Sequence, residues 1–304
     1  MKTNPKLAYS LIETSIVLVI VAILVAAVTQ GSVLVTKVKL NNARTLTQSS
    51  PVSSTPNLGL WLETTNESSF KTEYSNNAPL AGSSGSSVWY DSNAQLAKQN
   101  NALSTSNSPY SSNPLYVEKG INSLPALSFN GTSQYLDFTN PAILAATSYT
   151  IFVVEQPTKA ASGYNYFLAS KSACSANECF SMGHNFTSGY SIDLSHKTNL
   201  IATTSTEISG LTYKTNIPIL HSGIFSLTTG RKYFYNGIAG KSDSVTSALI
   251  GNTSMSIGKG YTAGYYQGLI GEIIFFTRAL TKAERWAIEQ YLGHKWGISV
   301  TQSS

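Results

Sequence analysis

The chain has 304 residues, 12% of them charged, and a net charge of +5 at pH 7. This length suffices for one large domain or two small ones. The Lys and Arg residues are scattered rather than arranged in a stripe with aromatic residues, so the composition argues against nucleic-acid binding. Seventeen tyrosines on a polar, uncharged background favour a β-sandwich outside the cytoplasm.

A short basic segment, residues 1–8, precedes a long apolar run. From Leu11 to Val28 the chain carries one charge, Glu13, and about 20 apolar residues are enough to span a bilayer. A secretory signal peptide would have a small residue at a cleavage site after its apolar run, whereas Ala8 comes before it. The sequence therefore predicts a membrane helix over residues 9–40.

This segment resembles the class III leader of type IV prepilins and type II secretion pseudopilins. Ala8 stands where that family has Gly, and Tyr9 stands where it usually has Phe. The resemblance implies cleavage between Ala8 and Tyr9 by a prepilin peptidase, followed by N-methylation of Tyr9. Glu13 then becomes the fifth residue of the mature chain, which is the position of the family's glutamate.

A carboxylate in a membrane helix costs a few kcal/mol unless it is paired or lies at the interface. The resemblance implies that Glu13 pairs with the amine of Tyr9, on the same or a neighbouring subunit, during assembly. The alternative is a Glu13 at headgroup level with no special role. The resemblance also implies an inner-membrane protein with a cytoplasmic N-terminus and a periplasmic C-terminal domain, or a cell-surface location within a filament.

Residues 41–57 are rich in Ser, Thr, Asn and Pro, which predicts a linker. After it, short runs of β-branched and aromatic residues recur, and Asn236-Gly237 predicts a hairpin turn. Such spacing is typical of a sandwich or barrel. The runs lie at 87–90, 125–130, 134–138, 149–156, 164–170, 189–195, 231–237, 253–259 and 269–280.

One helix is predicted near the C-terminus. Thr281 and Glu284 have the spacing of a capping box, in which each side chain bonds the backbone N–H of the other residue. The buried stripe is expected to contain Ala287, Ile288, Tyr291 and Leu292. Gly293 or Gly297 can end the helix.

Several segments resemble the concanavalin A-like, laminin G-type jelly roll of bacterial surface proteins. They are LWLE at 60–63, LPALSFNGTSQYL at 124–136, the FYNG hairpin and the segment 268–297. We therefore expect a mainly β protein, in which a long N-terminal helix precedes a jelly-roll sandwich (58–298) with a short C-terminal helix and a tail (299–304). The resemblance implies binding of glycans or proteins, or of Ca²⁺.

Residues that would support catalysis are not grouped in the sequence. Glycoside hydrolysis needs two carboxylates, whereas Glu272 and Asp193 each stand alone. The four histidines are dispersed, and no nucleophile, phosphate-loop or zinc-protease motif occurs. We therefore expect no catalytic residues, no enzymatic activity and no cofactor other than Ca²⁺.

Three tyrosines form the candidate ligand-binding loop. Tyr261, Tyr265 and Tyr266 lie in KGYTAGYYQG and could stack on a sugar ring, and the alternative is that they pack on the sheet. Asp137 and Asp243 are the Ca²⁺ candidates, since Ca²⁺ prefers oxygen ligands.

Cys174 and Cys179 are close enough in sequence to bridge a turn, as expected in an oxidising compartment. The alternative is two free thiols. Two cysteines with no nearby pair of histidines supply too few ligands for a zinc site.

The hypothesis from the sequence is a pilin-like or pseudopilin-like subunit of a type IV pilus or type II secretion-type system. Its N-terminal helix would contact other pilin-like subunits, and its sandwich would bind a glycan or surface protein. One alternative is a membrane-anchored binding module that never polymerises. Another is a surface glycan hydrolase.

Overall fold

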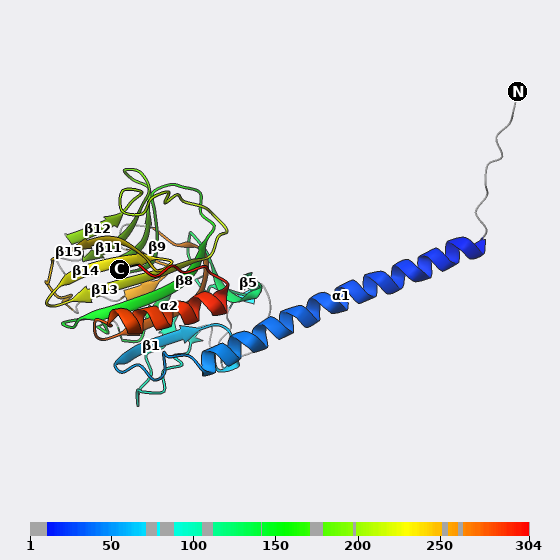
Figure 1. Ribbon diagram of the computed structural model, residues 1–304, viewed down its shortest axis with the longest axis horizontal. Coiled ribbons are helices and arrows are strands. Elements are labelled where there is room, and N and C mark those ends of the chain that lie inside the picture. The colour runs from blue at the N-terminus through cyan, green and yellow to red at the C-terminus, as the bar shows by residue number, and fades with distance from the viewer. Residues whose placement is uncertain are drawn as a thin grey trace, which may run out of the picture.

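The computed structural model describes residues 11–70, 78–79, 88–104, 112–140, 142–170, 179–196, 199–250, 255–260 and 264–303. A long helix, α1 (Leu11–Gln48), projects from a β-rich domain that carries a second helix, α2 (Lys282–Trp296), on one face (Figure 1). The predicted mainly β sandwich with a long N-terminal and a short C-terminal helix is confirmed.

Two antiparallel sheets contain the described strands, and a short 3-10 helix, η1 (Glu67–Ser69), follows β1. Sheet A consists of β1 (Leu58–Glu63), β2 (Ala78–Pro79), β5 (Leu115–Ile121), β6 (Leu124–Asn130), β8 (Tyr149–Pro157), β13 (Ile219–Ser226), β14 (Gly230–Tyr235), β15 (Ile238–Asp243) and β17 (Gln267–Phe276). Sheet B consists of β3 (Val88–Trp89), β4 (Ala102–Leu103), β7 (Leu136–Phe138), β9 (Tyr164–Ser170), β10 (Phe180–Asn185), β11 (Ser191–His196), β12 (Asn199–Thr203) and β16 (Met255–Ile257).

Sheet A has the order β15-β14-β13-β8-β17-β6-β5-β2, and sheet B has the order β12-β11-β10-β9-β16-β7-β4-β3. Strand β1 pairs with β17 beside Glu272–Phe276, while β6 pairs with β17 beside Gln267–Ile270. The first strand of the domain, β1, therefore pairs with its last strand, β17, and this brings the end of α1 close to α2.

The middle of sheet A is buried on both faces. In β8, Ile151 and Val153 belong to the core between the sheets, whereas Phe152 and Val154 belong to a second core beneath α2. Alternate residues of a strand point to opposite faces. The almost continuous apolar run at 149–156 is thus explained, because helix and sheet cover its two sides.

Helix α2 begins as its sequence predicts. Thr281 is the N-cap, both hydrogen bonds of the capping box with Glu284 form, and Gly297 ends the helix in the left-handed conformation. Ile288, Tyr291 and Leu292 are buried, but Ala287 is exposed. The buried face instead extends to Trp296, which completes the second core.

The predicted hairpin turn at Asn236-Gly237 joins β14 and β15, and both residues have positive φ, 48° and 79°. The C-terminal segment, which we predicted as a tail, packs against this turn. Thr301 N–H donates to the Asn236 carbonyl at 2.9 Å, and the Ser303 hydroxyl donates to the Gly237 carbonyl at 2.8 Å.

The predicted linker is wrong in its first half, because α1 continues without a break through Gly31 to Gln48. Thr45 and Thr47 donate their hydroxyls to the carbonyls of Asn41 and Ala43, so these polar side chains bond within the helix. Packing of an apolar side on the domain outweighs the linker-like composition, since Ala43 is 2% exposed.

The second half of that segment is also held on the domain. Val52 is fully buried in the second core. The side-chain amide of Gln95 donates to the carbonyls of Ser53 and Thr55, and the Arg278 guanidinium donates to the Pro56 carbonyl. Residues 49–57 therefore form a packed connection rather than a free linker.

A substitution at Gly271 on β17 tests how closely α2 packs on sheet A. A Cβ there would lie 2.7 and 2.8 Å from Cζ3 and Cζ2 of the buried Trp296 indole. Gly271→Ala is therefore expected to lower the free energy of unfolding by about 1–3 kcal/mol, through overpacking. Urea denaturation of the full chain in detergent measures this change.

The matched control is Gly264→Ala, where the nearest atoms to a new Cβ lie at 3.6 and 3.7 Å. That substitution should change the stability by no more than about 0.5 kcal/mol. Equal stability of the Gly271→Ala and Gly264→Ala proteins would contradict the close packing of Trp296 on β17.

Candidate functional site

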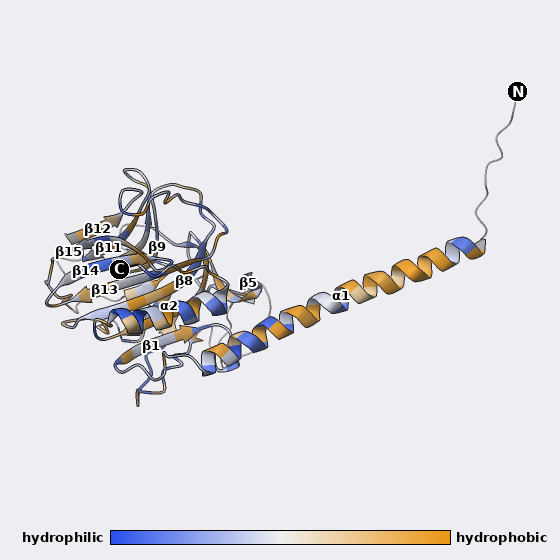
Figure 2. Cartoon of the chain, viewed as in Figure 1, coloured by the Kyte–Doolittle hydropathy of each residue, from blue (hydrophilic) through white to orange (hydrophobic). Residues whose placement is uncertain are grey.

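The outer part of α1 is apolar on all sides and uncovered. Apolar residues follow one another along this part of the helix (Figure 2). Their described side chains are exposed, for example Leu18 at 64% and Val28 at 72%. No part of the most apolar stretch of α1 is buried in the structure. A helix that is apolar all round needs lipid or protein around it. In the described part of the chain, α1 is the one helix that is long and apolar enough to cross a membrane.

The length of α1 allows it both to cross a bilayer and to reach the domain. At 1.5 Å per residue its 38 residues extend about 57 Å, against a hydrocarbon core of about 30 Å. Glu13 lies in the first turn of α1 and is exposed. The predicted cleavage and methylation residues, Ala8 and Tyr9, lie outside the described residues.

The C-terminal end of α1 is docked on the domain. Arg44 Nε donates to the Thr65 carbonyl at 2.8 Å, and the Arg44 guanidinium forms an ion pair with Glu67 at 3.0 Å. On the side facing α2, the hydroxyl of Thr47 lies 3.3 Å from that of Tyr291. The helix thus has two distinct parts, a docked base and a projecting apolar part (Figure 1).

Beneath this base lies a buried group that we call the Lys295 cluster. It comprises Lys295, Glu63, Glu272 and Tyr291. The Lys295 ammonium lies 3.2 Å from Glu63 and 2.8 Å from Glu272, and the three charged side chains are fully buried. Burial raises the pKa of Glu63, but Lys295 and the Thr65 hydrogen bonds more than offset this, so its pKa is lowered.

The carboxylate of Glu272, which stands alone in the sequence, is contacted by four donor groups. The indoles of Trp61 and Trp296 donate at 2.7 and 2.8 Å, and the Tyr291 hydroxyl donates at 2.8 Å. Lys295 is the fourth. Both oxygens of Glu272 are therefore contacted by buried donors.

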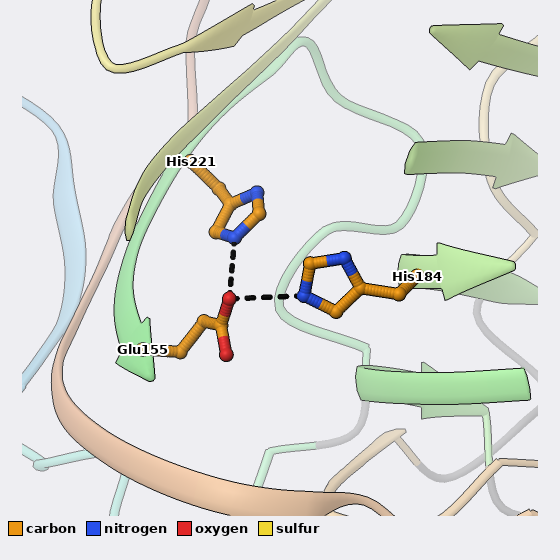
Figure 3. A group of neighbouring side chains, drawn as sticks. All are labelled: Glu155, His184 and His221. Atoms are coloured by element: carbon orange, nitrogen blue, oxygen red, sulfur yellow. Dashed lines mark hydrogen bonds and ion pairs between the residues drawn. The ribbon is translucent and has the colours of Figure 1, made fainter. Parts of the chain in front are cut away.

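A second buried group, the Glu155 cluster, joins the two sheets. It consists of Glu155 on β8, His221 on β13 and His184 on β10 (Figure 3). Nε2 of His184 and Nε2 of His221 lie 3.0 and 2.9 Å from the same oxygen, Oε1 of Glu155. All three side chains are fully buried.

Tyrosine hydroxyls bond the outer atoms of the Glu155 cluster. Tyr190 lies 3.1 Å from Nδ1 of His184, and Tyr233 lies 2.5 Å from Nδ1 of His221. Tyr266 donates to Oε2 of Glu155 at 2.5 Å. Each of the three cluster members is therefore oriented by a tyrosine.

Burial raises the pKa of Glu155, but the two histidines more than offset this and hold it at about 2. Burial lowers the pKa of His221, against the effect of Glu155. Burial, with Glu155 nearby, raises the pKa of Tyr266 well above its usual value.

A layer of half-buried aromatic rings covers the histidines. Rings of Phe186, Tyr190 and Tyr213 lie 6.5, 5.9 and 5.2 Å from the His184 ring, and Tyr235 lies 6.1 Å from His221. We call these four residues the aromatic cap. Burial raises the pKa of Tyr235 to about 12, with Glu155 adding to the effect.

The sequence did not predict the Glu155 cluster. His184 and His221 are 29 and 66 residues from Glu155, so no spacing motif joins them. One signal was available. Glu155 continues the alternation of Tyr149, Ile151 and Val153, which places a carboxylate on the core side of a strand.

The predicted ligand-binding tyrosines have different positions. Tyr266 is fully buried, packed 6.0 Å from Phe129 and bonded to Glu155, so its assignment as an exposed sugar-stacking ring is wrong. Tyr265 is half-buried, and Lys259 lies over the rings of Tyr265 and Tyr135, at 5.6 and 4.8 Å. Tyr261 lies outside the described residues.

The two calcium candidates do not come together. Asp243 accepts from the Arg231 guanidinium with both oxygens, at 2.5 and 3.3 Å, so a cation already occupies this carboxylate. Asp137 is buried on β7, in the other sheet. The group of potential metal ligands among the described residues is the Glu155 cluster, which contains neither aspartate.

Cys179 is disulfide-bonded. It is one of the two cysteines of the chain, and the other, Cys174, lies outside the described residues. A disulfide at this position is suited to an oxidising compartment.

No protein-family model matches the chain, and no curated protein sequence matches it either. Solved structures resemble it in fold. A Trypanosoma rangeli sialidase has a TM-score of 0.52 at 13% identity, over 82% of this chain and 34% of the sialidase chain. The same sialidase with 2,3-difluorosialic acid gives 0.50 at 12% identity over the same shares.

Domain 4 of AbnA, a GH43 extracellular arabinanase from Geobacillus stearothermophilus, in complex with arabinotriose, has a TM-score of 0.47 at 13% identity, over 60% of this chain and 82% of that domain. This chain spans about a third of the length of the sialidases it matches. The sialidase matches show a shared β-sandwich fold.

Lys295→Met tests the Lys295 cluster. The substitution keeps most of the side-chain volume but leaves Glu63 and Glu272 buried without their cation. We expect a loss of about 3–5 kcal/mol in the free energy of unfolding. Adding Glu63→Gln should recover part of the loss, because one stranded charge is removed.

The control is Lys241→Met. Its ammonium pairs with Glu207 at 3.0 Å, but the side chain is 50% exposed, so the expected loss is about 0–1 kcal/mol. Urea denaturation compares the two variants. A loss for Lys295→Met as small as that for Lys241→Met would show that the cluster does not hold α2 on sheet A.

Proposed function

We propose that the chain is a pilin-like or pseudopilin-like subunit of a type IV pilus or type II secretion-type system, which displays its sandwich domain for binding. The observation that carries the proposal is the two-part α1. Its outer part is apolar and exposed on all sides, and its base is docked on the domain. Such a helix is suited to lie first in the inner membrane and then among the helices of neighbouring subunits.

The N-terminal residues support the same role. The order of these residues follows the prepilin resemblance. A basic leader ends in Ala8, and Tyr9 and Glu13 follow at the head of an apolar run. Glu13 is at the outer end of α1, farthest from the domain, where it can pair with the amine of Tyr9 on a neighbouring subunit. The leader stays cytoplasmic in this proposal, and the domain is periplasmic or on the cell surface.

The domain acts by binding rather than by catalysis in this proposal, with a glycan or a surface protein as its ligand. The sandwich fold is shared with a Trypanosoma rangeli sialidase at 13% identity. Of the two carboxylates considered for hydrolysis, Glu272 is bonded in the Lys295 cluster, and Asp193 accepts from Tyr166, Asn185 and Ser191. Tyr265, with Tyr135 and Lys259, remains the candidate contact for a sugar.

Processing by a prepilin peptidase is the direct test. Co-expression of the full chain with the peptidase should remove residues 1–8 and leave an N-methylated Tyr9, because Ala8 and Tyr9 stand at the cleavage positions. Intact-mass and N-terminal peptide mass spectrometry measure the mature end. An unchanged N-terminus, or one other than Tyr9, would falsify the pilin-like assignment.

Glu13→Ala separates a filament subunit from a simple tether. The variant should still insert in the membrane, because the substitution removes a charge from an apolar helix. It should be lost from the sheared filament fraction, because the partner of the Tyr9 amine is missing. Membrane fractionation and immunoblotting measure both pools.

Glu118→Ala is the control, since Glu118 is an exposed glutamate on β5 of the domain. This variant should assemble as the wild type does. If Glu13→Ala assembles equally well, Glu13 has no role in assembly, and the chain is better described as a membrane-anchored binding module that does not polymerise.

A further inference from the structure

The Glu155 cluster has the composition of a metal site. Two imidazole nitrogens and one carboxylate oxygen, from three strands of two sheets, lie within 4.8 Å of one another (Figure 3). Imidazole and carboxylate are ligands of zinc and of other first-row divalent ions. We propose that Glu155, His184 and His221 bind one divalent first-row cation, with Zn²⁺ as the probe, and that this ion links the two sheets. The proposal is independent of the pilin-like role.

The distances within the cluster suit such an ion. Bonds of about 2.0–2.1 Å at tetrahedral angles separate neighbouring ligand atoms by about 3.3 Å. Nε2 of His184 and Nε2 of His221 lie 3.0 and 2.9 Å from Oε1 of Glu155. These two separations are a few tenths of an ångström shorter than that value, and the third, between the two Nε2 atoms, is within 4.8 Å.

The ligands are already oriented by outer partners. Metal-binding histidines generally bond a fixed partner through the second ring nitrogen. Here Nδ1 of His184 and Nδ1 of His221 face the hydroxyls of Tyr190 and Tyr233. Oε2 of Glu155 accepts from Tyr266, which leaves Oε1 directed at the two imidazoles.

The other buried glutamates explain what an ion adds. Glu63 and Glu272 contact Lys295, and Glu289 contacts Arg285 at 2.5 Å. Glu155 is equally buried, yet its described partners are histidines and a tyrosine. A divalent cation supplies the positive charge that the other three carboxylates receive from Lys or Arg.

An ion can reach the cluster from the side of the aromatic cap. Phe186, Tyr190, Tyr213 and Tyr235 are each half-buried and lie against the two histidine rings. Because these rings are partly exposed and contact the histidine rings, we place the route of the ion at the cap, through rotation of their side chains. Three protein ligands leave a coordination position for water.

The test uses the full chain, purified in detergent with a tag that contains no histidine and stripped with EDTA. After dialysis against Zn²⁺, atomic emission should find one zinc per chain, and the melting temperature should rise relative to the stripped protein. His184→Gln and His221→Gln should each abolish stoichiometric zinc. His196→Gln, which changes a buried histidine bonded to Tyr149 outside the cluster, should retain it.

A second pair of variants keeps every ring in place. Tyr190→Phe removes the hydroxyl that faces Nδ1 of His184 and should weaken zinc binding about 10- to 100-fold. Tyr213→Phe removes a hydroxyl of the same cap that donates to the Lys159 carbonyl, and should leave the affinity unchanged.

Absence of zinc from the wild-type protein, with an unchanged melting temperature, overturns the proposal whatever the variants do. Zinc lost equally from His196→Gln and His184→Gln, or equal affinities of Tyr190→Phe and Tyr213→Phe, would assign any bound metal elsewhere and overturn it too.

Discussion

The ammonium of Lys295, held between the carboxylates of Glu63 and Glu272, is the interaction on which the arrangement of the molecule depends. Glu63 ends the first strand, Glu272 lies on the last, and Lys295 comes from the last turn of α2. One buried charge therefore fixes α2 over the joint between β1 and β17. Tyr291 extends the same network to Thr47, so the base of α1 is bonded to it as well.

The two buried polar clusters differ in how their charge is balanced. In the Lys295 cluster, two carboxylates contact the ammonium of Lys295, and the indoles of Trp61 and Trp296 donate to one of them. The Glu155 cluster holds one carboxylate among imidazoles and phenols. The first cluster therefore joins α2 to sheet A through an ammonium, whereas the second joins the two sheets without a Lys or Arg among these contacts.

Features set by neighbouring residues could be predicted from the sequence, whereas those set by distant contacts could not. The capping box of α2 and the Asn236-Gly237 turn follow from local backbone chemistry, and both are present. The Ser/Thr-rich segment after residue 40 had a linker's composition, but burial of Ala43 and Val52 overrides it. Tyr266 had the sequence context of a surface loop, and its contact with Glu155 comes from a strand 111 residues away. The Glu155 cluster was missed for the same reason.

Residues 41–57 do not form the predicted flexible linker, and this limits the orientations in which the proposed subunit would display its domain. A flexible segment over 41–57 would let the sandwich sample many orientations about its anchor. Instead α1 is continuous into a docked base, and residues 49–57 are bonded to the domain through Gln95 and Arg278. The direction of α1 therefore fixes the direction of the domain. In a helical assembly every copy would then present the same face, so any binding surface would be repeated at one orientation along the filament, and weak single contacts could add through multivalency.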